Sequence, residues 1–80
     1  MPATLTMYST PWCGYCSRLK SQLTREGIAF VDVDIEQDEA AAARVMAVNG
    51  GNQTVPTLFF PDGTAATNPS LREVKARLSA

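Results

Sequence analysis

Residues 10–20 read TPWCGYCSRLK and contain Cys13 and Cys16, the only two cysteines of the 80-residue chain. Polar and apolar side chains alternate before this stretch, which predicts a strand over 4–8. After it, apolar side chains recur at helical spacing and predict a helix over 14–26. The two cysteines therefore lie where a strand ends and a helix begins.

Outward from this stretch, apolar periodicity and turn residues predict the remaining elements. They are a strand over 28–34, a helix over 39–49 capped by Asp38, strands over 57–60 and 64–67, and a last helix opened by a capping box of Ser70 and Glu73. The order β-α-β-α-β-β-α begins with a parallel, right-handed βαβ unit and continues with a hairpin and a covering helix. We expect one α/β domain over residues 1–80, with a four-stranded mixed sheet and helices on both faces.

Several positions in these elements have a predicted place. Gly27 is expected to end the first helix, because glycine readily adopts the left-handed conformation found there. Val31, Val33 and Ile35 share one side of the strand-like stretch after the first helix, and Leu71, Val74 and Leu78 form the apolar stripe of the last helix.

The composition excludes several classes of function. A net charge of −1 gives no general attraction to nucleic acid or to an anionic membrane. No apolar run approaches the ~20 residues of a membrane span, and the first residues lack the features of a signal peptide. The expected compartment is the cytoplasm, where structural disulfides are rare.

The cysteine pair allows four interpretations. A zinc site in one chain would need more ligands, and the sequence has no histidine and no further cysteine. An iron–sulfur cluster could form only by sharing cysteines between two chains. Two inert buried thiols are a third possibility. A CxxC motif in a βαβ pattern instead favours a thiol–disulfide oxidoreductase in which Cys13 and Cys16 close a redox-active disulfide.

The two cysteines are not expected to be equivalent. Cys13 lies at the helix start, where unpaired N–H groups favour a thiolate, so it is the expected nucleophile. Cys16 falls on the apolar stripe and should be more buried and less acidic. Gly14 leaves room for a partner's backbone. Tyr15 either flanks the sulfur or lies on the helix surface, and Trp12 either borders the site or packs in the fold.

Pro56 lies just before a predicted strand, in the stretch TVP over 54–56. Proline cannot donate to a sheet ladder, so its position needs an explanation. A cis Val55–Pro56 bond would supply one and would leave the Val55 backbone free to pair with a substrate. An ordinary trans proline at a strand start is the alternative.

With WCGYC at a strand–helix junction and TVP about 40 residues later, the chain resembles the glutaredoxin branch of the thioredoxin superfamily. The resemblance covers nearly the whole chain. It implies a thioredoxin-like domain with strand order 2-1-3-4, Cys13 as nucleophile, Cys16 as second thiol and a cis Pro56.

Within that branch, WCGYC, VNGGNQTVPT and DGTAATNPS are similar to the mycoredoxins. This resemblance implies reduction of mixed disulfides between client proteins and mycothiol. A second mycothiol and an NADPH-dependent mycothiol disulfide reductase would complete the cycle, with no bound cofactor and a monomeric protein. NrdH-redoxins, which take electrons from thioredoxin reductase, are an alternative, although their WSGFRPD-like segment is missing here. A dimer around a [2Fe–2S] cluster held by two Cys13 thiolates is an alternative of another class.

The sequence departs from ordinary glutaredoxins at the positions that bind the charged ends of the small thiol glutathione. Those proteins often carry a lysine three residues before the first cysteine and an acid at the start of the last helix; here Thr10 and the uncharged stretch 67–70 stand there. An uncharged polar pocket suits mycothiol, which lacks a free α-amine and ends in hydroxyls. The residues expected to line its groove are Tyr15, Thr54, Val55 and Pro56, and Thr67 and Asn68 are the pair expected to contact its sugar. Trp12 and Gly14 are expected on the side of the client, and Lys20 is left out of the site.

Overall fold

The computed structural model describes residues 5–79, which form seven elements in the predicted order. They are β1 (Leu5–Ser9), α1 (Gly14–Arg25), β2 (Phe30–Asp34), α2 (Glu39–Val48), β3 (Thr57–Phe59), β4 (Ala65–Thr67) and α3 (Leu71–Ser79). Residue 4 of the predicted first strand and the ends of the predicted 1–80 domain lie outside the described residues.

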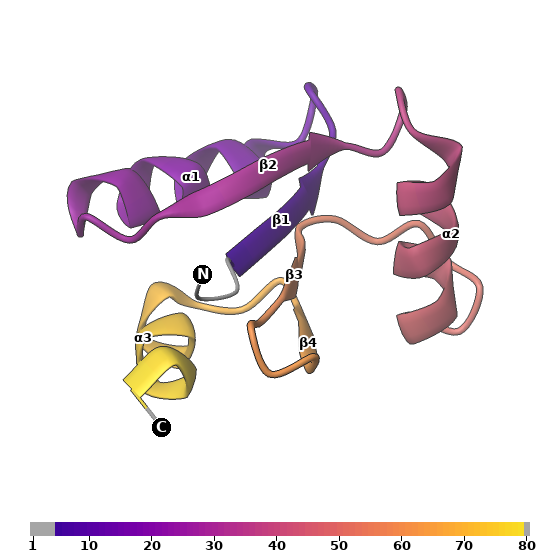
Figure 1. The fold of residues 1–80 in the computed structure, drawn as a ribbon. Coiled ribbons are helices and arrows are strands. Elements are labelled where there is room, and N and C mark those ends of the chain that lie inside the picture. Colours follow the sequence, from indigo (N-terminus) through magenta and orange to yellow (C-terminus); the bar gives the residue numbers. More distant parts are fainter. Residues whose placement is uncertain (1–4, 80) are drawn as a thin grey trace.

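The four strands form one sheet in the order β2-β1-β3-β4, as the resemblance implied. β1 pairs in parallel with β2, while β3 is antiparallel to both β1 and β4. Helices α1 and α3 lie on one side of the sheet and α2 on the other (Figure 1). The expected mixed sheet with helices on both faces is therefore confirmed, and the α1 start lies at the end of a central strand.

Two buried clusters hold these layers together. The first joins α1 and α3 to the sheet and includes Met7, Cys16, Leu23 and Val74, each with essentially no exposed surface. The second joins α2 to the opposite face and is centred on Val45. Full burial of one aliphatic side chain contributes about 1.5–3 kcal/mol to folding, so both clusters fix the sheet that carries the cysteine pair.

The end of α1 explains why β2 begins later than predicted. Gly27 has φ +71° and its N–H donates to the Thr24 carbonyl, while the Ile28 N–H donates to the Leu23 carbonyl. These two bonds are the Schellman arrangement, which satisfies the last carbonyls of a helix. Ile28 is thus part of the helix ending, and the strand starts at Phe30.

One side chain from each of these two apolar sets is exposed. Val31 keeps 49% of its surface exposed, because the cluster under α2 reaches Val33 and Ile35 but not the early part of this edge strand. Leu78 keeps 37% exposed, since the contact of α3 with the core is centred on Val74, one helical turn earlier. The side of β2 that carries Val31 and Val33 is therefore covered only toward its end, and the buried part of the α3 stripe is shorter than the stripe itself. Within residues 5–79, no helix is long and apolar enough to cross a membrane.

Candidate active site

Cys13 is the N-cap residue of α1. Its backbone is extended, with φ −85° and ψ 111°, and its Sγ accepts the Cys16 N–H at 3.1 Å. A thiol thus takes the place that a Ser or Asp oxygen usually has at an N-cap. The donated N–H and the positive end of the helix dipole both stabilise negative charge on this sulfur.

The other side of the Cys13 sulfur faces the turn that precedes β3. The Cys13 thiol donates to the Val55 carbonyl oxygen over 3.9 Å, and the Val55–Pro56 bond is cis, which confirms that expectation. Cys13 is buried except for 8% of its surface. A partner sulfur must therefore approach through a narrow opening between the start of α1 and this turn.

The residues on either side of Cys13 are open to solvent. Trp12 is 71% exposed and Tyr15 is 64% exposed. The Trp12 indole N–H donates to a Glu36 carboxylate oxygen at 2.7 Å, which holds the ring toward the end of β2. An added Cβ at Gly14 would meet nothing within 4 Å, so the approach over this residue is open.

Cys16 lies one turn deeper and has no exposed surface. Burial raises the pKa of the Cys16 thiol from its ordinary 9.0 to about 12, with the hydrogen bond to Cys13 as the second cause. At neutral pH Cys16 is therefore a thiol. The two free cysteines have different chemistry, since only Cys13 combines a route to solvent with groups that stabilise a thiolate.

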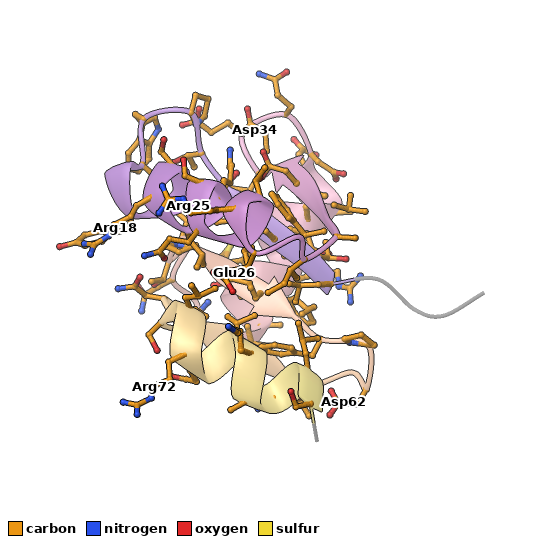
Figure 2. The ribbon with its side chains drawn as sticks, turned by 90° about the vertical axis from the view of Figure 1, so that its left-hand side faces the viewer. Arg18, Arg25, Glu26, Asp34, Asp62 and Arg72 are labelled. Atoms are coloured by element: carbon orange, nitrogen blue, oxygen red, sulfur yellow. The ribbon has the colours of Figure 1, made fainter. Side chains whose placement is uncertain are left out.

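A groove of about 280 Å³ lies between α1 and the start of α3, and we call it the α1–α3 groove. Neither cysteine lines it, but Tyr15, which lies between them in the sequence, does. The groove wall consists of Tyr15, Arg18, Leu19 and Gln22 from α1, and Asn68, Pro69, Ser70 and Leu71 from the other side. Figure 2 shows α1 above α3, with Arg18 and Arg72 both pointing outward on the side where the helices begin. A small molecule attached to Cys13 could lie in this groove.

Asn68 is the one residue of the expected sugar-binding pair that lines this groove. Its backbone N–H donates to the Pro56 carbonyl at 2.7 Å, and its φ is +47°, in the left-handed region that asparagine tolerates. The Thr67 hydroxyl donates instead to Asn49 Oδ1 at 2.5 Å, and Thr67 is not part of the groove wall. The Thr54 carbonyl accepts the Thr57 hydroxyl at 2.8 Å, and Thr54 itself is exposed.

Some residues near the site were not found from the sequence. Asn49 donates to the Val45 carbonyl and to the Thr57 hydroxyl, so it ties the end of α2 to β3. Arg18 and Gln22 line the groove because they are on the α1 face toward α3. Their i, i+4 spacing was visible in the sequence, but the position of α3 was not.

A metal site is not formed by the described part of the chain. Among residues 5–79, no three His, Cys, Asp or Glu side chains come together in a way that could hold a metal ion.

Residues 5–64 match the sequence model of the family Glutaredoxin. The chain belongs to the glutaredoxin family. A Mycobacterium tuberculosis protein assigned to the glutaredoxins is 60% identical over 76 residues, which cover 95% of this chain and 90% of the relative. Mycoredoxin 1 of Corynebacterium glutamicum is 44% identical over 78 residues, which cover 98% of this chain and 96% of that protein.

The solved structures agree with this assignment. The glutaredoxin of Methanosarcina mazei superposes with a TM-score of 0.80 at 22% identity, over 99% of this chain and 81% of that one, which shows the shared fold. A buckwheat glutaredoxin–glutathione complex superposes with a TM-score of 0.69 at 29% identity, over 94% of this chain and 69% of that one. This glutaredoxin is therefore a thiol–disulfide oxidoreductase with a thioredoxin-like fold.

Proposed function

We propose that this glutaredoxin reduces mixed disulfides between proteins and mycothiol, with mycothiol as the electron donor. The observation that carries the proposal is the near full-length similarity to Mycoredoxin 1 of Corynebacterium glutamicum. The different environments of the two cysteines support it, because a mixed disulfide needs one accessible nucleophile.

The proposed reaction consists of two exchanges at Cys13. The Cys13 thiolate attacks the mycothiol sulfur of the protein–mycothiol disulfide, and the protein thiolate leaves and takes a proton from solvent. Cys13 is then joined to mycothiol. The thiolate of a second mycothiol attacks the sulfur of the bound one, which releases mycothiol disulfide and restores the Cys13 thiolate. An NADPH-dependent reductase returns the mycothiol disulfide to two thiols.

The α1–α3 groove is the proposed place for the sugar and inositol of mycothiol. The Asn68 amide, the Ser70 hydroxyl and the Arg18 guanidinium offer donors and acceptors to a molecule that ends in hydroxyls. Tyr15, Thr54, Val55 and Pro56 would contact the part nearest the sulfur, and Thr67 would contact the sugar together with Asn68. A guanidinium also binds carboxylates, so Arg18 suits glutathione as well, and the choice of small thiol needs a direct comparison.

The client protein is proposed to contact the exposed rings beside Cys13. Trp12 and Tyr15 offer a large apolar surface with polar ends, as is common where proteins meet. The open space over Gly14 allows the client's backbone to come close. The scheme needs one copy of the chain, no resident cofactor and a cytoplasm that keeps thiols reduced.

The experiment is NADPH consumption with one mycothiolated protein and three electron sources in separate reactions. The sources are mycothiol with its reductase, glutathione with its reductase, and thioredoxin reductase alone. We expect turnover with mycothiol at least tenfold above that with the other two. Equal or faster turnover with glutathione, or with thioredoxin reductase as for an NrdH-redoxin, would contradict the proposed substrate but not the oxidoreductase family.

A further inference from the structure

Cys16 has no role in the two exchanges described above, although its sulfur lies within a turn of Cys13. It could instead attack the Cys13 adduct and release the small thiol, forming a Cys13–Cys16 disulfide. Its complete burial disfavours the thiolate that this attack requires. A nearby positive charge would stabilise the Cys16 thiolate, and the same helix carries one.

Lys20 follows Cys16 by four residues on α1, which places the two side chains on one helix face. Its Nζ lies 2.7 Å from Oδ2 of Asp32 on β2, and 32% of its side chain remains exposed. The Lys20 charge lowers the pKa of Cys16 and so opposes the effect of burial. Sequence analysis alone had left Lys20 outside the site.

Asp32, which forms the ion pair with Lys20, also accepts a hydrogen bond from a buried residue of β1. The Ser9 hydroxyl donates to Asp32 Oδ1 at 2.6 Å, and Ser9 keeps only 2% of its surface exposed. Asp32 pairs in the sheet with Met7, which belongs to the same buried cluster as Cys16. Ser9 and Met7 are two apart on β1, so Ser9 and Asp32 both point to the face of the sheet that α1 covers.

Among residues 5–79, the groups that face Cys16 come from three elements packed around it. Around Cys16, α1 supplies Cys13 and Lys20, β2 supplies Asp32, and α3 packs on the cluster through the apolar Val74. On the β1 side, the Thr10 backbone forms a hydrogen bond with Cys16 that also favours the thiolate. Lys20 is therefore the cation that acts on Cys16, and Asp32 and Ser9 keep it in place.

We propose that Lys20, oriented by Asp32 and Ser9, is a positioning residue that enables Cys16 to resolve a mixed disulfide on Cys13. Cys16 gives its proton to solvent, its sulfur bonds to Cys13 Sγ, and the bond from Cys13 to the small thiol breaks. The small thiolate leaves with the electron pair and takes a proton from solvent. The inference rests on the proposed exchange at Cys13, but not on mycothiol being the small thiol.

The test uses reduced protein and one equivalent of 5,5′-dithiobis(2-nitrobenzoate) in a stopped-flow instrument. Attack by Cys13 releases a first coloured thiolate, and attack by Cys16 on the resulting adduct releases a second. The ratio of the second rate to the first isolates the step assigned to Cys16. This ratio does not depend on mycothiol, so it remains informative if the proposed electron donor is wrong.

Lys20→Met removes the charge and keeps the length of the side chain. Loss of this positive charge should raise the pKa of Cys16 and lower its thiolate fraction, and the greater nucleophilicity of the more basic thiolate should offset only part of this loss. We therefore expect the rate ratio to fall about threefold between pH 7 and 9. Lys20→Arg, which keeps the charge and can reach Asp32, should restore the ratio.

Lys75→Met is the matched control. Lys75 forms an ion pair of similar length, 2.8 Å to Glu26, but on the surface between α3 and the end of α1. This variant should leave the ratio unchanged. An unchanged ratio in Lys20→Met, an equal fall in Lys75→Met, or no restoration in Lys20→Arg would each overturn the proposal.

Discussion

The two ends of the first turn of α1 differ more than their separation of three residues suggests. At its start, the Cys13 sulfur receives a backbone N–H, lies at the positive end of the helix and has an opening to solvent. At its end, Cys16 is enclosed by Met7, Leu23 and the rest of the first buried cluster. The same residue type thus lies beside a backbone donor and an opening to solvent at one end, and within the apolar core at the other, where burial raises its pKa.

The largest effect should follow from substitution at the helix start. Cys13→Ser removes the nucleophile but leaves a hydroxyl, which is a preferred N-cap group, so α1 should still form. We expect reduction of a mixed disulfide to fall by about a thousandfold or more, to background, because an alcohol does not replace a thiolate in this exchange. Activity measurement with far-UV circular dichroism checks this, and substantial activity in a folded variant would contradict the assignment.

A chemical comparison of the two thiols should show the next largest effect. Cys16→Ser leaves Cys13 as the only thiol, and Cys13→Ser leaves Cys16. Alkylation by iodoacetamide at pH 7.5 should be about a hundredfold faster in the first variant, because buried thiols are inert. In denaturing urea the two rates should converge. Similar rates in the folded proteins would show that Cys16 is as accessible as Cys13.

Stability at alkaline pH should also distinguish the two positions. The folded chain holds the Cys16 proton up to a pKa of about 12, whereas an unfolded thiol loses it near 9. The unfolded state therefore binds fewer protons above pH 9, and the contribution of Cys16 to stability, complete below pH 9, is lost between pH 9 and 12. Between pH 8 and 10.5, urea unfolding should show wild type losing about 2 kcal/mol more than Cys16→Ser. A constant difference between the two proteins would contradict the raised pKa.

A smaller effect is expected in the α1–α3 groove. Asn68→Gly removes the amide and keeps a residue that tolerates the positive φ. Loss of about one hydrogen bond, worth about 1 kcal/mol, should raise the KM for mycothiol about fivefold with little change in kcat. Asn52→Gly, at an exposed position that does not line the groove, is the matched control. Equal KM values for both variants would remove Asn68 from the proposed binding site.

The part of the fold that the sequence predicted is the part fixed by local patterns. The element order, the end of α1 at Gly27 and the α1 start at the cysteine pair follow from periodicity and capping. The strand order came from the resemblance, because no local pattern specifies which strands pair. The exposure of Val31 was not predictable for a related reason, since alternation shows that a strand has two sides but not how far a helix covers one of them.

The site was predictable to a similar extent. The inequality of Cys13 and Cys16 follows from the start of a helix and its apolar stripe, and the structure has both features. Arg18 and Gln22 line a groove only because α3 packs beside α1. Lys20 forms its ion pair only because β2 carries Asp32 next to α1. The hydrogen bond from Thr67 to Asn49 likewise joins elements far apart in the chain. These are tertiary relations that spacing in one sequence does not contain.

The most direct test of the division between the two cysteines is the activity of Cys16→Ser. The measurement is NADPH-coupled reduction of a mycothiolated protein, with wild type and Cys13→Ser in parallel. If Cys13 alone carries the exchanges, Cys16→Ser should keep activity within about twofold of wild type, since serine at a buried position changes packing and not the nucleophile. Loss of activity to the level of Cys13→Ser, in a variant that remains folded, would contradict the account and make the dithiol route the main one.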